Sequence, residues 1–223
     1  MAPKYTLHYF DIPARGEPIR MLFAVAGVEY EDKRYTFNDI PSIKANDNLF
    51  PLGQVPVLEV DSESICQSHS ITRFLANEFD LYGSTNQEKA IIDQVLDTLK
   101  HLQEQVLGAY LWKSTEEEKI KQLEDLHKDY IPRVYKMLET FLKRNNNGEG
   151  FLVGDKMTLG DVMIVNSIET LQLPFNLKKY ENFIDKYSLL KGYNGRVRNA
   201  GNLKEYLKKR GPPTYTRLIT PKF

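Results

Sequence analysis

Two short stretches, Val55-Pro56 and Gln67-Ser68, carry residue types that suit an extended, peptide-like ligand. Proline cannot donate to a strand ladder, and a cis bond before proline costs only about 0.5–1 kcal/mol, so a bend is expected before the apolar run that follows. Such a bend predicts that the backbone N–H and C=O of Val55 stay free to pair with a guest as in a strand. After Ser68 the apolar residues recur at helical spacing, so Gln67-Ser68 is expected at a helix N-terminus, which suits a carboxylate. The same residues also fit a hairpin and a capped helix without any ligand.

Several other chemistries are disfavoured by the residues. Cys66 is the single cysteine, which excludes a disulfide framework and a Cys-x-x-Cys redox or zinc pair, and it is interpreted as a buried apolar residue. The four histidines show no metal spacing such as His-Glu-x-x-His, so no metal is expected. Ser68-His69 lies in no Gly-x-Ser-x-Gly elbow, which argues against a hydrolase dyad.

Charge and hydropathy narrow the class of partner. Thirty basic residues balance thirty acidic ones, so no broad field attracts nucleic acid or an anionic membrane, and neither is expected as a partner. With 41% hydrophobic and 27% charged residues, the chain of 223 residues has an ordinary globular composition. It contains no apolar run of about 18 residues and no secretory signal, so a cytoplasmic location is expected.

The elements that must position these stretches follow from periodicity. Residues 5–10 alternate as a strand, a helix with an apolar face ends at Gly27, and residues 29–36 form a less apolar strand that is expected near an edge. This is a βαβ unit, and a short helix at 41–44, a hairpin from 57 to 67 and the helix after Ser68 complete a thioredoxin-like α/β order. Residues 1–80 are therefore predicted to form the first domain.

Residues 81–85 are predicted to be a linker, and 86–223 an all-helical bundle domain with a C-terminal tail. Capping boxes are expected at Thr85-x-x-Glu88, Ser114-x-x-Glu117 and Thr158-x-x-Asp161. Pro132 lies inside a helical pattern and is expected to kink that helix rather than end it. A last short helix is expected around Leu203 to Leu207, and the tail from 211 to 223 need not be regular.

A strand that ends in Tyr9, Gln54-Val55-Pro56, Gln67-Ser68 and the helical second half together resemble a cytosolic glutathione S-transferase. The resemblance runs from about residue 5 to residue 210, and it is closest to the sigma class, which is similar to haematopoietic prostaglandin D synthase and the S-crystallins. It includes Val57-Leu58-Glu59-Val60-Asp61 and Val153-Gly154-Asp155-Lys156-Met157-Thr158. The tail beyond residue 210 is longer than the family usually carries.

The resemblance implies a role for each matching residue. Tyr9 takes the place of the tyrosine that hydrogen-bonds the glutathione sulfur, and Arg15 that of the arginine that tunes the sulfur. Lys44 would reach the glycyl carboxylate, and Val55, between Gln54 and a cis Pro56, would pair with the cysteinyl backbone. Gln67 and Ser68 would hold the γ-glutamyl carboxylate. The catalytic residues are then Tyr9 and Arg15, and the glutathione-binding residues are Tyr9, Arg15, Lys44, Gln54, Val55, Pro56, Gln67 and Ser68.

Some positions depart from the family. Ile40 stands where sigma enzymes tend to carry a tryptophan that contacts glutathione, and two extra residues fall between 46 and 52. The acidic residue that the partner subunit usually contributes falls near Lys100-His101, flanked by Asp97 and Glu104. A homodimer is implied, with Leu52 or Phe50 as apolar anchors across the interface and Asp97 near the twofold axis.

The expected activity is conjugation of glutathione, as its thiolate co-substrate, to a small hydrophobic electrophile, as in detoxification. Tyrosine suits the sulfur because its own pKa near 10 keeps it a donor. One alternative is a glutathione-dependent prostaglandin-type isomerase, and another is an S-crystallin or ligand-binding protein with little activity. A redox thioredoxin-fold protein is disfavoured because the loop at Asp11-Ile12-Pro13-Ala14 lacks the cysteine pair.

Overall fold

The computed structural model describes residues 3–111, 115–171 and 180–212. The chain divides into two compact units, one containing the residues up to Asp80 together with those from Ala200 onward, and the other containing Leu81–Asn199. We describe each unit by itself. Among the described residues, no helix is both long enough and apolar enough to cross a membrane.

The first unit is built on a four-stranded mixed sheet with the order β2-β1-β3-β4. Strand β1 runs parallel to β2 and antiparallel to β3, and β3 and β4 form the expected hairpin. The predicted βαβ unit is therefore confirmed, and its second strand lies at the edge. The strands are β1 (Tyr5–Phe10), β2 (Glu31–Tyr35), β3 (Val57–Val60) and β4 (Glu63–Cys66).

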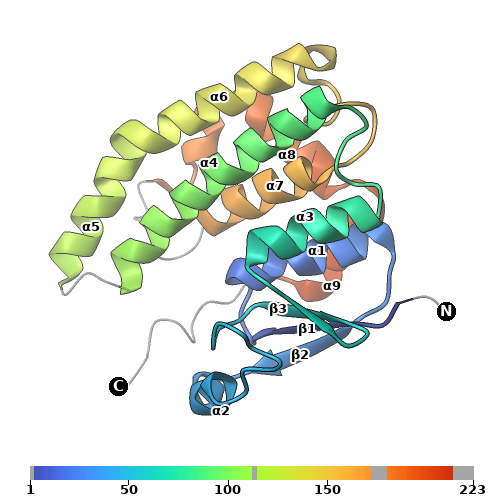
Figure 1. The fold of residues 1–223 in the computed structure, drawn as a ribbon. Helices are drawn as coiled ribbons and strands as arrows, with labels where there is room; N and C mark the ends of the chain where they lie inside the picture. The colour runs from blue at the N-terminus through green and yellow to red at the C-terminus, as the bar shows by residue number, and fades with distance from the viewer. Residues whose placement is uncertain (1–2, 112–114, 172–179, 213–223) are drawn as a thin grey trace. The chain divides into compact units, whose positions relative to one another are not determined.

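Helices α1 (Glu17–Ala26) and α3 (Ser68–Glu78) lie side by side on one face of this sheet (Figure 1). Strand alternation turns Tyr5, Leu7 and Tyr9 toward these helices, and the Tyr5 ring meets that of Phe23 at 5.4 Å. His8 lies on the opposite face, where its ring packs 5.7 Å from that of Phe50. The short helix α2 (Ile40–Lys44) closes this smaller core through its buried Ile43.

Gly27 ends α1 as predicted, with φ of 67° in the left-handed region that favours glycine. The last helix, α9 (Gly201–Arg210), packs against α1 with Leu203 and Leu207 buried. The sequence places this segment in the helical domain; in the structure it belongs with the sheet. The reason lies in Glu17 of α1, which accepts hydrogen bonds from Tyr206 Oη (2.9 Å) and Arg210 Nη1 (2.5 Å) of α9.

The second unit is helical. Helix α4 packs along α7, and α8 packs against both α6 and α7 (Figure 1). The helices are α4 (Asn86–Leu111), α5 (Glu116–Asp125), α6 (Ile131–Arg144), α7 (Leu159–Leu171) and α8 (Ser188–Arg198). The segment expected to be a linker is tied to this unit, because the Leu81 carbonyl accepts a hydrogen bond from Leu159 N at 2.7 Å.

Shorter helical segments join these elements. A π-helical segment, Leu126–Tyr130, joins α5 to α6, and Pro132 lies in the first turn of α6. The prediction that Pro132 does not end the helical run is confirmed. Single turns of 3₁₀ helix occur at Ala14–Gly16, Phe37–Asp39, Asn146–Gly148 and Phe183–Lys186.

One of the three predicted capping boxes is complete: Glu88 N donates to Thr85 Oγ1 at 3.1 Å, and Thr85 N donates to Glu88 Oε2 at 3.4 Å. At Thr158 only half of the box forms, because the Asp161 carboxylate accepts from Thr158 N and Oγ1, each at 2.7 Å, while Asp161 N donates to the Thr158 backbone carbonyl. The third prediction includes Ser114, which lies outside the described residues, and the box at α5 uses Thr115 and Glu118 instead. Ser114 and Thr115 each have a glutamate three residues later, so the pattern alone cannot choose the register.

Candidate functional site

Residues around the start of α3 enclose an open hollow of about 290 Å³ in the first unit. Three segments supply its walls: the β1–α1 loop, the loop before β3 and the β4–α3 junction. The lining residues are Arg15, Leu52, Gln54, Val55, Pro56, Cys66, Gln67 and Ser68. All but Leu52 and Cys66 are residues for which the sequence predicts a glutathione-binding role, so residues more than 50 positions apart in the chain meet at one place.

Val55 lies two residues before the start of β3. The Val55–Pro56 bond is cis, as the sequence indicated. The ladder between β1 and β3 ends with the pair His8–Val57, so Val55 lies outside it. Pairing of the Val55 backbone with a bound peptide stays a prediction, and its position beyond the last ladder pair is compatible with it.

Gln67 is the N-cap of α3 and adopts φ of 71° and ψ of 115°. Its carbonyl accepts the first helical hydrogen bond from Ile71 N at 2.9 Å. No side chain of the described residues caps this end of α3. The first N–H groups of an α-helix have no partner within the helix, so this end presents donors and positive potential to an anion.

Tyr9 stands next to the hollow without lining it. Its ring is 5% exposed, and its hydroxyl oxygen accepts a hydrogen bond from Arg15 N at 3.1 Å. Burial raises the pKa of the Tyr9 phenol above its ordinary value, and the hydrogen bond from Arg15 and the charges of Arg15 and Arg20 offset this only in part. The phenol therefore stays protonated at neutral pH and keeps its own proton to donate.

Gly16 makes room for the Tyr9 ring. A Cβ atom at Gly16 would lie 2.4 Å from Tyr9 Cδ1 and 2.8 Å from Cγ, well inside van der Waals contact. The 3₁₀ turn Ala14–Gly16 therefore packs its backbone directly onto the ring. The position of the phenol depends on a residue without a side chain.

Arg20 holds the same loop from the buried side. Its side chain is 2% exposed, and it donates from Nη1 to the Ile12 carbonyl (2.9 Å) and from Nη2 to the Phe10 carbonyl (3.3 Å). Its Nε donates to Asp32 Oδ2 at 3.0 Å, and Glu17 Oε2 lies 3.7 Å from Nη1. A buried charge persists when it is paired and hydrogen-bonded, as here. Arg20 thus fixes the end of β1 and the loop that carries Arg15.

Lys44 is exposed at the end of α2 and does not line the hollow. It lies beside Gly53, because a Cβ atom at Gly53 would be 3.4 Å from Lys44 Cγ. Lys44 therefore lies next to the residue that directly precedes Gln54. Reach to a bound carboxylate stays a prediction.

Sequence reasoning missed Leu52 and Cys66 as lining residues and Gly16 and Arg20 as supports. Cys66 directly precedes Gln67, so its position in the sequence could have indicated that it lies at the same site. Its side chain is partly buried, and burial raises the pKa of the thiol, which therefore stays protonated. Arg20 lies within an otherwise apolar run, between Ile19 and Met21, and a charged residue inside such a run is a sign of a buried pair. Within the described part of the chain, no cluster of histidine, cysteine and acidic residues is arranged to hold a metal.

Comparison with known proteins agrees with this arrangement. The model of the glutathione S-transferase N-terminal domain matches residues 5–77, and that of the C-terminal domain matches residues 87–210. Glutathione S-transferase 1 of Ascaris suum is 32% identical over 215 residues, covering 96% of this chain and 100% of its own length. S-crystallin 4 of Enteroctopus dofleini is 30% identical over 217 residues, covering 93% of this chain and 97% of its own.

Solved structures show the same likeness. A sigma class glutathione S-transferase of Fasciola hepatica superposes with a TM-score of 0.81 at 27% identity, covering 94% of this chain and 97% of its own. Prostaglandin synthase D of Nilaparvata lugens superposes with a TM-score of 0.79 at 32% identity, covering 95% and 100%. Both domain models match in order, and the relatives are covered nearly end to end. The chain belongs to the glutathione S-transferase family.

Proposed function

We propose that the first unit binds glutathione in the hollow at the start of α3 and activates it as a thiolate for transfer to an apolar electrophile. One observation carries the proposal. Arg15 lines the hollow and donates its backbone N–H to the hydroxyl of a buried, protonated Tyr9. The phenol therefore has an acceptor lone pair already engaged and its O–H available for a sulfur anion.

The energetic demand on these groups is modest. A thiol with a pKa near 8.5 is only about 3% ionised at pH 7, so complete ionisation is a gain of about thirtyfold in nucleophile, or about 2 kcal/mol. A charge-assisted hydrogen bond from Tyr9 together with the nearby Arg15 cation is of that size. The remaining acceleration comes from holding thiolate and electrophile together.

The other residues hold the tripeptide in place. Gln67, Ser68 and the N–H groups at the start of α3 bind the γ-glutamyl carboxylate, and the Val55 backbone pairs with the cysteinyl residue in strand fashion. Gln54 and Lys44 lie toward the glycyl end. A ligand fixed at both ends and at its backbone presents its sulfur at one position, beside Arg15 and Tyr9.

The test is an ultraviolet pH titration of glutathione bound to the native protein and to Tyr9→Phe. We expect thiolate absorbance near neutral pH for the native complex, and in the variant only near the ordinary thiol pKa. Tyr5→Phe is the matched control, because it removes one hydroxyl from an equally buried ring on the same strand. Identical curves for native protein and Tyr9→Phe would refute the role of Tyr9.

The likeness to prostaglandin synthase D of Nilaparvata lugens favours one second candidate, a glutathione-dependent isomerase. The same thiolate would add to the substrate and leave again, so glutathione would not be consumed. An assay that follows free glutathione alongside product separates the two: conjugation consumes one glutathione per turnover, and isomerisation consumes none.

The likeness to S-crystallin 4 raises a non-enzymatic candidate, a protein that keeps the fold with little activity. The presence of both Tyr9 and Arg15 argues against it. If immobilised glutathione retained the protein while a chloronitrobenzene was not conjugated, the crystallin interpretation would replace the enzymatic one.

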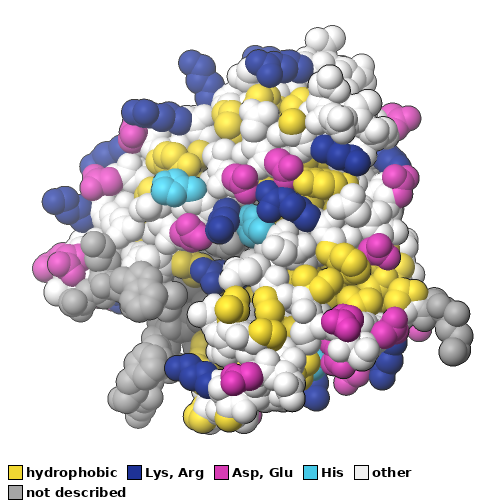
Figure 2. Space-filling view, in the orientation of Figure 1, with side chains coloured by type: hydrophobic (Ala, Val, Ile, Leu, Met, Phe, Trp, Pro, Cys, Tyr) yellow, Lys and Arg dark blue, Asp and Glu magenta, His cyan; other side chains and the backbone are white. Residues whose placement is uncertain are grey.

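We further propose a sigma-class homodimer located in the cytoplasm, with a role in detoxification. Leu52 supports the dimer as an apolar anchor because its side chain is 54% exposed. Phe50, the alternative anchor, is 3% exposed and packs with Ile43 and Val57, so it is already used inside the subunit. On the face drawn in Figure 2, basic and acidic side chains are interspersed, which is compatible with small-molecule substrates rather than nucleic acid.

A further inference from the structure

Glu17 is a buried carboxylate that directly follows the turn packed against the Tyr9 ring. It is 2% exposed, and it does not line the hollow at the start of α3. Its backbone N–H and that of Gly16 both donate to the Pro13 carbonyl, at 3.0 and 3.1 Å. Glu17 therefore closes the turn whose Arg15 N–H donates to the Tyr9 hydroxyl.

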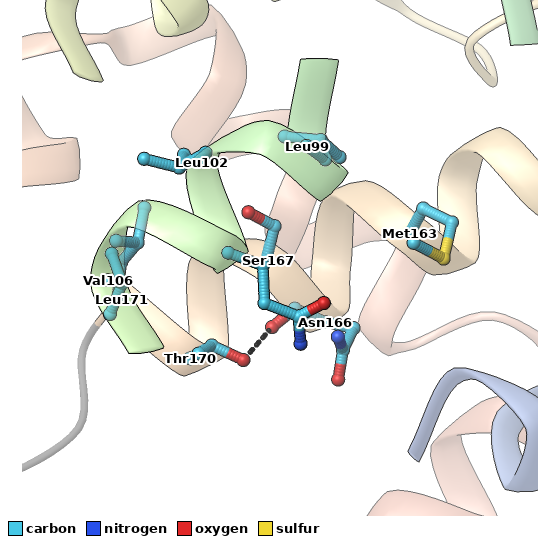
Figure 3. Close-up of a pocket in the computed structure, with 9 residues that line it drawn as sticks. Leu99, Leu102, Val106, Met163, Asn166, Ser167, Thr170 and Leu171 are labelled. Carbon is cyan, nitrogen blue, oxygen red and sulfur yellow. Dashed lines mark hydrogen bonds between the residues drawn. The ribbon is translucent and has the colours of Figure 1, made fainter. Parts of the chain in front are cut away.

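The partners of this carboxylate lie far along the chain. Tyr206 Oη, 189 residues away, donates to Glu17 Oε1 at 2.9 Å, and Arg210 Nη1, 193 residues away, donates to the same oxygen at 2.5 Å. Figure 3 shows a local contact for comparison: the Thr170 hydroxyl on α7 donates to the Asn166 carbonyl one turn earlier, at 2.8 Å. A local bond of that kind stays within one helix, whereas the bonds to Glu17 join α9 to the start of α1.

These partners explain why a charge persists at this buried position. A buried carboxylate is costly unless it is paired and hydrogen-bonded. Burial and the charge of Glu17 raise the pKa of the Tyr206 phenol, so Tyr206 stays protonated and donates at neutral pH. Arg210 supplies the opposite charge, and its side chain is only 14% exposed. Loss of both partners would leave Glu17 buried with Arg20 as its ion partner, at 3.7 Å.

Arg20 connects Glu17 to the loop and to the phenol. Its Nη1 lies 3.7 Å from Glu17 Oε2 and donates to the Ile12 carbonyl at 2.9 Å. Its guanidinium carbon lies 5.8 Å from the centroid of the Tyr9 ring. If Glu17 lacked its partners on α9, its uncompensated charge would attract Arg20 away from these contacts.

We propose that Glu17, held by Tyr206 and Arg210 of α9, is a positioning residue for thiolate formation. It fixes the turn that directs the Arg15 N–H at the Tyr9 hydroxyl, and it keeps the Arg20 cation beside the Tyr9 ring. The inference rests on the proposed function, because what it governs is ionisation of the thiol bound beside Tyr9. A catalytic donor is held in its productive geometry by the groups that support it, so loosened support lowers its effect.

The test is the ultraviolet pH titration of bound glutathione with Arg210→Met. This change is expected to raise the pKa of the bound thiol by about 1 relative to the native complex, a tenfold weaker ionisation. Leu203→Ala is the matched control, because Leu203 is fully buried on the same helix and its truncation lowers stability at least as much. It is expected to leave the pKa of the bound thiol unchanged.

A double variant tests whether Arg210 acts through Glu17. In a Glu17→Gln background, Arg210→Met is expected to keep no more than about a third of its effect on the pKa of the bound thiol, because the charge it pairs with is gone. Tyr206→Phe removes one hydrogen bond without changing any charge, and a smaller rise is expected; it decides the question if Arg210→Met does not fold. Equal effects of Arg210→Met in both backgrounds, or no rise with Tyr206→Phe, would overturn the inference.

A measurement without glutathione separates this inference from the proposed function. The Arg15 N–H is bonded to the Tyr9 hydroxyl, so its hydrogen exchange, followed by nuclear magnetic resonance, reports how firmly the turn is held. Exchange is expected to be about tenfold faster in Arg210→Met than in Leu203→Ala. Equal exchange in the two variants would overturn the inference. If Tyr9→Phe titrated like the native protein, the proposed function would fail, while the Arg15 exchange would still decide whether α9 positions the turn.

Discussion

Gly16 shows how closely the residues around the phenol are fitted. The backbone of its 3₁₀ turn packs against the Tyr9 ring so closely that a Cβ atom at Gly16 would lie only 2.4 Å from Tyr9 Cδ1. The phenol is not free to yield, since its hydroxyl is bonded to Arg15 N and its ring is buried. The position of the Tyr9 phenol thus depends on the missing side chain at Gly16 as much as on the hydrogen bond from Arg15 N.

Gly16→Ala is therefore expected to lower both stability and activity. Forcing a methyl group into a packed site costs about 1–3 kcal/mol, and displacing a catalytic group by about 1 Å can cost a hundredfold in rate. Urea unfolding and kcat/KM for conjugation are the measurements.

The matched control is Gly195→Ala, in helix α8, where a Cβ atom meets nothing within 4 Å. This change is expected to stabilise the protein by about 0.5–1 kcal/mol and to leave conjugation unchanged. If Gly16→Ala behaved like Gly195→Ala, the close fit to the Tyr9 ring would have no functional meaning.

At the scale of elements, helix α9 is joined to α1 through one buried carboxylate. Glu17 is 2% exposed, accepts hydrogen bonds from Tyr206 and Arg210 of α9, and lies 3.7 Å from Arg20 Nη1. Since Arg20 also holds the Phe10 and Ile12 carbonyls, the last helix and the β1–α1 loop share one ionic network.

Arg210→Met is expected to destabilise the protein by about 1–3 kcal/mol, because it removes a partner from a buried charge while keeping the side-chain stem. Urea unfolding followed by circular dichroism measures the loss. Lys209→Met on the same helix is the control, since Lys209 is exposed and its removal is expected to change stability by less than about 0.5 kcal/mol. Equal effects of the two changes would contradict the buried network.

What the sequence predicts well at this scale is local. Alternation over residues 5–10, the apolar face before Gly27 and the proline before β3 each depend on neighbouring residues, and the structure has all three. The placement of α9 depends on a pairing between Glu17 and residues about 190 positions later, for which no local pattern exists. The α5 capping box was displaced by one residue because two overlapping patterns compete.

The candidate site was predictable to a similar degree. Residues within recognisable motifs, such as Gln54-Val55-Pro56 and Gln67-Ser68, line the hollow together. Leu52 and Gly16 belong to no recognisable motif. Leu52 lines the hollow and Gly16 leaves room for the Tyr9 ring, and both contacts arise only when the chain folds.

At the scale of the whole molecule, the proposed homodimer makes a prediction about Leu52. Size-exclusion chromatography with light scattering is expected to give the native protein about twice the chain mass of 25.9 kDa. Leu52→Asp is expected to shift it toward the single-chain mass, because a charge placed in an apolar interface is left without a partner.

Ile120→Asp is the comparison, since Ile120 is another exposed large apolar residue, at 40%, and lies on α5. It is expected to keep the native mass. A native protein of 25.9 kDa would contradict the dimer, and a dimer that survives Leu52→Asp would remove Leu52 from its interface.

The return of α9 to the first unit also has a consequence for how the protein is made. A ribosome releases the sheet, α1 and α3 before the helical unit, yet the helix that packs on α1 and pairs with Glu17 follows that unit in the chain. The nascent α/β unit must wait, with one flank of α1 uncovered, while the entire helical unit is translated. The α/β unit begins to be synthesised before the helical unit and is therefore completed after it.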